Sequence, residues 1–403
     1  MILPIIARAC FFKCVVNCVL EKIVIPYPKA SWSALFAACM LVACGGGGSD
    51  TTPLAPVTAV KVMGDSLADS GTYGFKFTVQ GSAATGAGSS AIWPERIAAS
   101  YGQTLCSHYT SSGTTFTTNA ACGNYAVGGG RINYVAAPTS PSSVTQQIKD
   151  AGSAGFGGGD LVLIDGGAND MADLIGAYLK AASDSGQAYA GLLTTVLDPA
   201  AVRTAMASGP SGMAQIGGAY AKTLAAQFAN TIKTNTLNKG ATRVAVLNVP
   251  AITKTPRFQM VLGAIAKAKG VEAATQAQAL FDGWVNVFNA QLAASLGGDA
   301  RLVVVDFYTS MKDQSEHPAQ YQLTNASTPA CPATGVGSDG LPTYTFATCT
   351  AASLSAMTPP TGATGGADWW RSYGFADSFH PTPYAHQLMG QLVSRSLSQA
   401  GWL

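Results

Sequence analysis

Four short runs of apolar and β-branched residues constrain the fold more than any other feature of the sequence. Each is of strand length, and they lie at 57–63, 161–165, 243–248 and 302–306. Stretches rich in Ala, Leu and Gln alternate with them, at 92–101, 171–182, 213–238, 271–296 and 383–399. Runs that are apolar throughout are typical of parallel strands covered on both faces. We therefore expect an α/β fold, a three-layer αβα sandwich with a mainly parallel five-stranded sheet whose fifth strand lies at 124–127.

The composition limits the kinds of partner that the chain can bind. With 403 residues, 48% of them hydrophobic, the chain can bury a large core. Charged residues make up only 11% of the chain and the formal net charge is +2, so no basic surface for nucleic acid is expected. The low charge and the 45 glycines are typical of an exported, loop-rich protein.

The first predicted strand ends in a turn that presents a serine. Residues 64–67 read Gly-Asp-Ser-Leu, and this turn is expected to open a helix. Open α/β sheets keep their chemistry at the carboxyl ends of their central strands. Ser66 is therefore a candidate nucleophile, with its own backbone N–H pointing the same way as its hydroxyl. Asp65 is expected to hold the turn.

Three further short segments follow this turn along the chain. Residues 124–129 read Asn-Tyr-Ala-Val-Gly-Gly, residues 167–170 read Gly-Ala-Asn-Asp, and residues 377–381 read Asp-Ser-Phe-His-Pro. Together with Gly-Asp-Ser-Leu, and in this order, they resemble the four blocks of the GDSL, or SGNH, esterases and lipases. The resemblance covers roughly residues 57–400 and implies a single SGNH hydrolase-like catalytic domain. Thr72 stands where many relatives have asparagine, a departure that leaves the serine unaffected.

The candidate general base is a histidine close to the C-terminus. A serine hydroxyl becomes nucleophilic when a base of near-neutral pKa takes its proton, and histidine suits that task. His380 is the predicted base, because Asp377 lies just before it and can accept from Nδ1–H while Nε2 faces Ser66. The predicted triad is therefore Ser66, His380 and Asp377. Other histidines are expected to be structural or to lack a carboxylate placed in this way: His108, His317 and His386.

Acyl transfer also requires hydrogen-bond donors for the oxyanion. The resemblance implies three of them: the backbone N–H of Ser66, the backbone N–H of Gly129 and the side-chain amide of Asn169. Glycine lets the main chain approach a substrate without a Cβ, and an amide donates without carrying a charge. Each segment also has a simpler interpretation, since glycines 128–130 could form only a flexible turn, and Asn169 and Asp170 could cap a helix. Their combination with the predicted triad favours the catalytic interpretation.

The N-terminal residues are expected to be a leader and not part of the fold. Lys29 precedes an apolar run at 34–44 that ends in Leu-Val-Ala-Cys. This pattern predicts a secretory signal over 1–44. Its ending resembles a bacterial lipoprotein box, which implies that Cys44 becomes a lipidated N-terminus and a membrane anchor. A transmembrane anchor at 2–20 is the alternative, but polar and charged residues interrupt that stretch.

The remainder of the chain divides into a linker and one catalytic domain. Residues 45–56 read as a flexible Gly/Ser/Pro linker, and residues 57–403 as the SGNH hydrolase domain. A Pro/Gly/Thr/Ser-rich insertion at about 314–367 stands outside the strand and helix rhythm. Our hypothesis is that this insertion shapes the pocket for the acyl group or the alcohol, and the alternative is a purely structural flap.

Four cysteines follow the leader: Cys106, Cys122, Cys331 and Cys349. They allow three pairings, and the two local pairs, Cys106 with Cys122 and Cys331 with Cys349, would each close a short loop. Disulfides would require an oxidising compartment, which favours an outer-membrane or periplasmic lipoprotein, or a secreted protein. Zinc is the competing interpretation, but neither pair has Cys-x-x-Cys spacing, so no metal and no cofactor is expected.

These features together predict an exported serine ester hydrolase of the carboxylesterase or lipase type. Its substrates would be esters of small molecules or lipids, cleaved through an acyl-enzyme. An acyltransferase or a carbohydrate-acetyl esterase could use the same site, because the site does not fix the acceptor. A non-catalytic surface lipoprotein on the same fold is the third hypothesis, and the intact set of candidate catalytic residues speaks against it.

Overall fold

The computed structural model of the chain describes residues 55–81, 90–113 and 115–403. The predicted leader, most of the predicted linker and the predicted lipidation of Cys44 lie outside these residues. Within the described part of the chain, no helix is both long and apolar enough to cross a bilayer.

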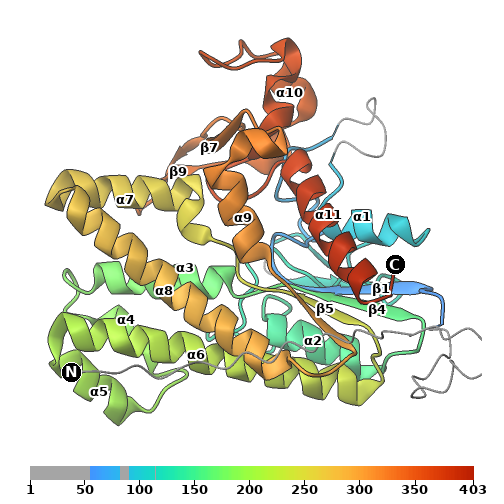
Figure 1. The fold of residues 1–403 in the computed structure, drawn as a ribbon, viewed down its shortest axis with the longest axis horizontal. Helices are drawn as coiled ribbons and strands as arrows, with labels where there is room; N and C mark the ends of the chain where they lie inside the picture. The colour runs from blue at the N-terminus through green and yellow to red at the C-terminus, as the bar shows by residue number, and fades with distance from the viewer. Residues whose placement is uncertain (1–54, 82–89, 114) are drawn as a thin grey trace, which may run out of the picture. The chain divides into compact units, whose positions relative to one another are not determined.

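The centre of the fold is a parallel sheet of four strands in the order β1-β4-β5-β6 (Figure 1). The strands are Ala59–Met63 (β1), Asp160–Ile164 (β4), Val244–Leu247 (β5) and Leu302–Val305 (β6). Leu163 of β4 lies between Val62 of β1 and Ala245 of β5 in the parallel register. Each apolar run forms the strand that it predicts, and the predicted α/β class is confirmed.

The fifth strand predicted at 124–127 is wrong. This segment makes two isolated parallel bridges, both through Asn124: one to Val62 of β1 and one to Ser107. Val62 exchanges two backbone hydrogen bonds with the chain on either side of Asn124. The chain then turns away from the sheet, because the Asn124 side chain accepts the backbone N–H of Ala126 at 2.9 Å. The described sheet is therefore four-stranded.

Helices cover both faces of this sheet and so produce the three layers. Side chains alternate along β4, with Val162 and Ile164 in one buried cluster and Leu161 and Leu163 in the other. The first cluster is covered by α2 (Val144–Ser153), α3 (Ala168–Lys180), α6 (Gly209–Asn235) and α8 (Val271–Leu296). The second is covered by α1 (Trp93–Ser100) and α11 (Pro383–Gln399). Burial on both faces explains why β5 and β6 are apolar throughout and why β1 and β4 each contain a single charged residue, Lys61 and Asp160.

Further helices, which the sequence does not predict, lie between the predicted ones: α2, α4 (Gln187–Leu193), α5 (Pro199–Ala207), α7 (Pro256–Lys269) and α9 (Phe307–Glu316). The start of α7 is set by local signals and not by a long apolar period. Thr255 caps it by accepting the backbone N–H of Phe258, and Pro256 occupies its first turn. The sequence prediction depends on long apolar periods, and short capping signals of this kind fall outside it. It therefore does not include these helices.

The insertion at 314–367 has secondary structure of its own. It begins inside α9 and carries β7 (Asn325–Pro329), β8 (Gly335–Val336), β9 (Pro342–Thr343) and α10 (Ala351–Ser355), which Figure 1 shows near the top. Strand β7 pairs in parallel with β10 (Tyr373–Phe375), just before Asp377. A small buried cluster joins insertion residues such as Phe346 and Leu354 to Trp369 and Trp370, which follow the insertion. The insertion is therefore packed against the chain that leads into the predicted triad.

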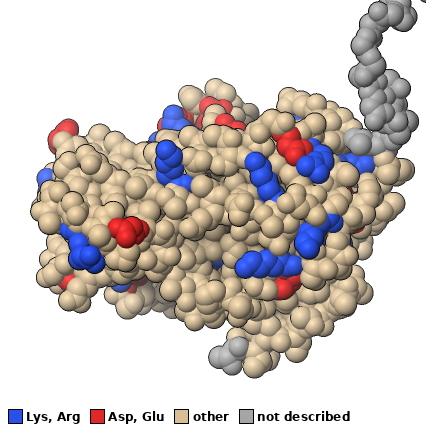
Figure 2. Space-filling model, turned by 90° about the horizontal axis from the view of Figure 1, so that it is seen from below, with Lys and Arg blue, Asp and Glu red and all other residues tan. Residues whose placement is uncertain are grey.

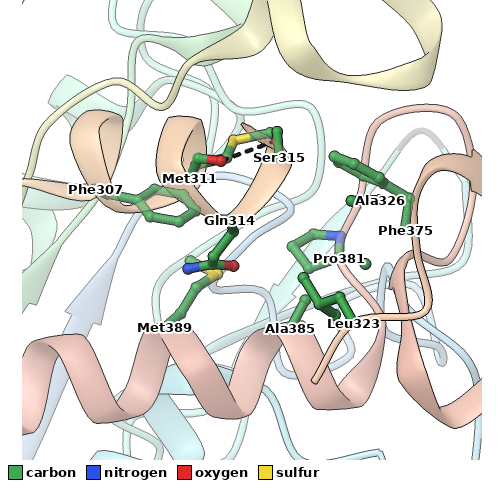
Figure 3. Close-up of a pocket in the computed structure, with 11 residues that line it drawn as sticks. Phe307, Met311, Gln314, Ser315, Leu323, Ala326, Phe375, Pro381, Ala385 and Met389 are labelled. Atoms are coloured by element: carbon green, nitrogen blue, oxygen red, sulfur yellow. Dashed lines mark hydrogen bonds between the residues drawn. The ribbon is translucent and has the colours of Figure 1, made fainter. Parts of the chain in front are cut away.

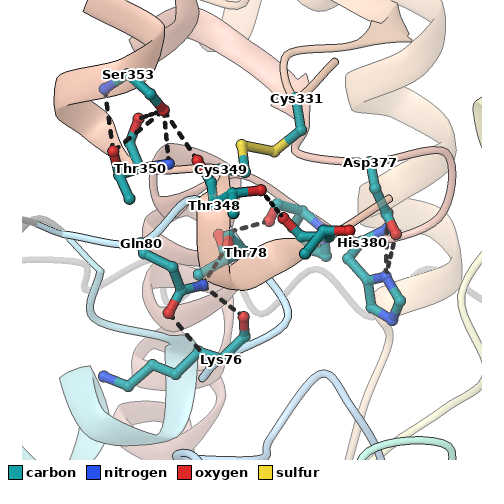
Figure 4. Close-up of a disulfide and its surroundings, with 12 residues drawn as sticks. Lys76, Thr78, Gln80, Cys331, Thr348, Cys349, Thr350, Ser353, Asp377 and His380 are labelled. Carbon is teal, nitrogen blue, oxygen red and sulfur yellow. Dashed lines mark hydrogen bonds and ion pairs between the residues drawn. A yellow bond between two sulfur atoms is a disulfide. The ribbon is translucent and has the colours of Figure 1, made fainter. Parts of the chain in front are cut away.

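Both local cysteine pairs are disulfides in the structure. Cys106 bonds to Cys122 on either side of the hairpin of β2 (Tyr109–Ser111) and β3 (Phe116–Thr118). Cys331 bonds to Cys349 within the insertion (Figure 4). Disulfides form and persist in oxidising compartments, so these two disulfides indicate an extracellular or periplasmic environment.

Charged side chains are sparse on the surface. Figure 2 shows lysine and arginine side chains that lie singly or in small groups on a mostly uncharged face, with a few acidic ones among them. The described residues on this face do not form the continuous basic surface that binding to a phosphate backbone requires.

Candidate active site

Buried side chains hold the turn that carries Ser66. The backbone N–H of Gly64 donates to Oε1 of Gln147 on α2 at 2.8 Å. The backbone N–H of Asp65 donates to Oδ1 of Asp165, directly after β4, also at 2.8 Å. Two neighbouring elements therefore fix the backbone just before Ser66, which is itself buried at the carboxyl end of β1.

Asp65 and Asp165 form a pair of buried carboxyl groups behind the serine. Burial raises the pKa of both, and the negative charge of Asp65 raises the pKa of Asp165 further, well above its ordinary value. These effects favour a neutral Asp165. Gly64 is required here, because a Cβ at that position would lie 1.8 Å from Oδ1 of Asp165. Asp65 in turn accepts the backbone N–H of Leu67 at 3.0 Å, as expected of a residue that holds the turn.

His380 lies between Ser66 and Asp377. Its Nε2 is 2.8 Å from the Oγ of Ser66, and its Nδ1 is 2.9 and 3.0 Å from the two carboxylate oxygens of Asp377. Figure 4 shows the Asp377 side chain directed at the imidazole. The structure thus brings Ser66 and His380, which are 314 positions apart in the sequence, into one chain of hydrogen bonds with Asp377.

The Asp377 carboxyl group is buried and remains ionised. Burial alone would raise its pKa. The charge of the neighbouring His380 and the hydrogen bonds from that imidazole and from two backbone N–H groups outweigh burial, so the pKa lies below its ordinary value. The backbone donors are Phe379 at 2.8 Å and His380 at 2.6 Å. The carboxylate can therefore accept from Nδ1–H and leave Nε2 facing the serine.

The other described histidines lie away from Ser66. His386 is fully buried on α11, and burial lowers its pKa well below the ordinary value, so it is a neutral, structural residue. His108 stacks on Tyr125 with ring centroids 4.0 Å apart. The expectation that His317 lacks a carboxylate is wrong, because its Nδ1 lies 2.8 Å from Asp313 one helical turn earlier. That pair is exposed on the surface.

The three candidate oxyanion donors lie around the serine turn. Asn169, in the first turn of α3, donates from Nδ2 to the backbone oxygen of Gly130 at 3.0 Å and to Oδ2 of Asp65 at 3.4 Å. These contacts connect the amide both to the loop that contains glycines 128–130, here called the glycine loop, and to the turn at 64–67 that carries Ser66, the serine turn. Among the described residues, no acceptor bonds to the backbone N–H of Ser66 or of Gly129. Gly129 has φ of +75°, which favours glycine.

The glycine loop is not merely a flexible turn. A Cβ on Gly128 would lie 2.1 Å from the ring of Phe77, so the aromatic ring packs directly on the backbone there. The backbone N–H of Gly128 donates to Oδ2 of Asp69 at 2.8 Å. Thr72, the departure from the family pattern, donates its N–H to the same carboxylate at 2.7 Å and its hydroxyl to Ala126 O at 3.1 Å. Asp69 therefore joins the serine loop to the glycine loop.

Asp170 connects α3 to the segment that follows the glycine loop. Its carboxylate accepts the backbone N–H of Ile132 at 2.9 Å and that of Asn133 at 2.8 Å. The interpretation of Asn169 and Asp170 as helix caps is wrong, since α3 follows Gly167 and has no side-chain cap. Complete burial raises the pKa of Asp170 to about 6, although the two N–H donors oppose this.

We expect stability to reflect the ionisation of Asp170. The unfolded group ionises near pKa 3.8 and the folded group near about 6, so the folded state loses stability as the pH rises through this window. Asp170→Asn cannot ionise, and its free energy of unfolding relative to wild type should rise by about 2 kcal/mol from pH 4 to pH 7. Urea unfolding of both proteins at pH 4 and pH 7 measures this difference. The cost of losing one carboxylate oxygen as an acceptor is the same at both pH values, so it cancels when the two differences are compared. An identical difference at both pH values would contradict the raised pKa.

Several contacts in this site involve residues that the sequence prediction lacks: Gln147, Asp165, Asp69 and Phe77. Asp165 had a usable signal, because it is a carboxyl group at the end of a buried strand that neighbours the serine strand. Gln147 and Phe77 lie in segments without a motif. Their roles depend on packing between distant parts of the chain, which residue types alone do not indicate.

A narrow apolar cavity opens beside Ser66. Part of its wall comes from the segment after β5, where Pro250, Ile252 and Thr255 line it. Phe375 and Phe379, on either side of Asp377, line another part. An ester group that reaches Ser66 would therefore meet a mostly hydrocarbon surface.

A serine at a strand end, an imidazole and a buried carboxylate on a parallel αβα sheet have the arrangement of serine hydrolases. The chain belongs to the GDSL-like Lipase/Acylhydrolase family, whose sequence profile matches residues 60–393. No curated protein matches the chain. The family establishes a hydrolase of the esterase or lipase type that acts on small-molecule esters. Among the described residues, no group of three or more His, Cys, Asp and Glu side chains is arranged to hold a metal ion.

Proposed function

We propose that this protein is an exported serine ester hydrolase that cleaves carboxylic esters through an acyl-enzyme. Ser66 Oγ attacks the ester carbonyl carbon while Nε2 of His380 takes the hydroxyl proton. The same imidazole then gives this proton to the departing alcohol oxygen, which leaves the acyl group on Ser66. Water, deprotonated by His380, attacks the acyl-enzyme and releases the carboxylic acid, and the proton returns to Ser66.

The observation that carries this proposal is the distance of 2.8 Å between Nε2 of His380 and Oγ of Ser66. A base within hydrogen-bonding distance can remove the proton as the new bond forms. The bonds from Nδ1 to the Asp377 carboxylate support the same assignment, because they favour the tautomer that leaves Nε2 unprotonated. Asp377 would also stabilise the imidazolium that forms during the attack.

In this proposal the oxyanion receives hydrogen bonds from the backbone N–H groups of Ser66 and Gly129 and from the Asn169 amide. The first two groups have no acceptor among the described residues, which supports their availability to a substrate. Arg131 donates to the backbone oxygen of Gly129 at 2.7 Å and so helps to hold the loop. The two backbone donors need no rearrangement when charge develops on the carbonyl oxygen, whereas Asn169 would exchange its longer bond, 3.4 Å to Oδ2 of Asp65, for one to the oxyanion.

Export is the cellular part of the proposal. The apolar run and Leu-Val-Ala-Cys ending at 34–44 support removal of a leader and lipidation of Cys44. The two disulfides of the catalytic domain support folding in an oxidising compartment. An outer-membrane or periplasmic lipoprotein, or a secreted form, would meet both conditions.

Covalent labelling with a fluorophosphonate tests the proposed function. The reagent reacts with a serine that a neighbouring base has activated. We expect stoichiometric labelling of the wild type at Ser66 and none of Ser66→Ala. A wild type that stays unlabelled while folded would overturn the assignment and favour a non-catalytic binding protein.

Asn169→Ala is expected to lower kcat for ester hydrolysis by roughly 10²- to 10³-fold, the usual effect of removing one oxyanion donor. The wild-type amide bonds to the Gly130 and Asp65 oxygens at the edge of the site, so the fold should tolerate its removal. Initial rates with p-nitrophenyl butyrate measure the loss, and thermal unfolding serves as the control. A folded variant with near wild-type kcat would remove Asn169 from the oxyanion hole.

A further inference from the structure

Ser66 lies at the first of two neighbouring apolar cavities. The second cavity lies between α9, α11 and β10, and Figure 3 shows the side chains that surround it. Four residues line both cavities and so form a wall between them: Phe307, Met311, Phe375 and Pro381. All four are buried, and Met311 is the most flexible of them. Met311 is therefore a wall residue that both cavities contact.

Both cavities are small and suit uncharged hydrocarbon. The cavity at Ser66 has a volume of about 20 Å³ and the second about 30 Å³. On a scale where about 10–15 Å³ holds one water molecule, each has room for only one or two groups of methyl size. Neither cavity is lined by lysine or arginine. The far end of the second is closed by Leu323, Ala385 and Met389.

The position of His380 indicates which part of an ester enters the first cavity. The departing alcohol oxygen must lie near Nε2, because His380 gives it a proton. Three rings flank this imidazole, those of Phe77, Phe346 and Phe379, with centroids 5.2, 5.4 and 5.7 Å from it. Only Phe379 lines the cavity at Ser66, whereas Phe77, Phe346 and His380 do not. Two of the three rings beside the imidazole therefore lie outside the cavity, which assigns the alcohol to the side of Phe77 and Phe346 and leaves the cavity for the acyl chain.

We propose that the first cavity is the acyl subsite, that it admits short saturated acyl chains, and that the Met311 side chain closes it against longer ones. An acyl group up to about the size of propionyl, with two carbons beyond the carbonyl, fills the first cavity, whereas a longer chain must displace the wall to reach the second. This inference rests on the proposed function, because it takes Ser66 to be the nucleophile. It assigns the substrate class: neutral esters of short-chain carboxylic acids.

The test is the dependence of kcat/KM on acyl length in Met311→Ala. With p-nitrophenyl acetate, propionate, butyrate, hexanoate and octanoate, kcat/KM of the wild type should be highest on the short esters and fall steeply beyond propionate. Removing the Met311 side chain joins the two cavities, so the ratio of octanoate to acetate rates should rise on the order of tenfold or more. Met311→Leu keeps the volume and should retain the wild-type ratio.

Two further variants make the test specific. Met206→Ala removes a partly buried methionine on α5, in the other core cluster, and should leave the ratio unchanged. Ala385→Leu, added to Met311→Ala, refills the second cavity and should reverse the gain on octanoate. Should Met311→Ala not fold, Met311→Val opens the wall less and should shift the ratio in the same direction.

The outcomes separate this inference from the proposed function. Failure of the fluorophosphonate to label wild-type Ser66 would overturn both. Full labelling of Met311→Ala with an unchanged acyl-length profile would overturn the acyl subsite alone. The last measurement uses a series of alkyl acetates, in which only the alcohol grows longer. If Met311→Ala changed the dependence of kcat/KM on the length of the alcohol and not on the length of the acyl chain, the cavity would hold the alcohol and the proposal would be overturned.

Discussion

Ser66→Ala and His380→Ala are each expected to lower kcat for ester hydrolysis by roughly 10⁴- to 10⁶-fold, and the double variant should be no slower than either one. The hydroxyl and the imidazole, 2.8 Å apart, share a single proton. Without the hydroxyl there is no nucleophile for the base to activate, and without the base the hydroxyl keeps its proton. Their effects on the barrier are therefore not additive.

Initial rates of p-nitrophenyl butyrate hydrolysis by the two single variants and the double variant measure this coupling. Ser396→Ala is a suitable control, because it removes a partly buried hydroxyl on α11 that bonds only to its own helix. Residual activity should remain above the uncatalysed rate, since the oxyanion donors are still present. A double variant slower by a further hundredfold would mean that the two side chains act in separate steps.

The layers of the fold follow from the sequence because strand burial leaves a local signature. The stretches 161–164 and 302–305 are apolar at every position, as expected for strands covered on both faces, and each is followed by an aspartate where the strand ends. The segment at 124–127 has a similar composition, but it leaves the sheet after one bridge. The cause is a hydrogen bond that the Asn124 side chain accepts from the backbone N–H of Ala126, which competes with strand pairing. Composition alone does not reveal that competition.

The residues of the candidate site also fall into two groups, those that the sequence indicates and those that only the structure reveals. Ser66, Asn169, Asp377 and His380 stand in short motifs, so their residue types and order indicate them before any geometry is known. Phe77 and Met311 stand in no motif. Phe77 contacts the glycine loop and His380 only because the chain folds back over them. Residues that act through packing therefore require the structure, whereas residues that act through chemistry are readable in the sequence.

The insertion at 314–367 contributes one residue beside the His380 imidazole and others that line the second cavity. Phe346 lies just before Cys349, and its ring packs 5.4 Å from the His380 imidazole. Leu323 and Ala326, at the other end of the insertion, line the second cavity. These contacts favour the hypothesis that the insertion shapes the substrate pockets over that of a purely structural flap. The sequence of the insertion does not indicate that Phe346 lies beside His380 or that Leu323 and Ala326 line the second cavity.

Asp377→Asn is expected to lower kcat by about 10⁴-fold while the loop stays in place. An asparagine oxygen can still accept the backbone N–H groups of Phe379 and His380, which bond to Oδ1 in the wild type. The amide NH2, which replaces the Oδ2 that lies 2.9 Å from Nδ1, can only donate to that nitrogen. The imidazole would then carry its proton on Nε2, the nitrogen that faces Ser66, and could not take the serine proton. Rates with p-nitrophenyl butyrate, together with thermal unfolding, measure the two effects separately.

Asp377→Ala provides the comparison that separates catalysis from loop stability. It loses the acceptor for the imidazole and for both backbone donors, so it should be as slow as Asp377→Asn and also less stable. Equal unfolding temperatures for the two variants would mean that the carboxylate does not hold the loop. An Asp377→Asn enzyme within tenfold of wild type would show that other contacts set the tautomer of His380. The catalytic importance of Asp377 would then reduce to its place in the loop, because a base already oriented by its surroundings needs no carboxylate partner.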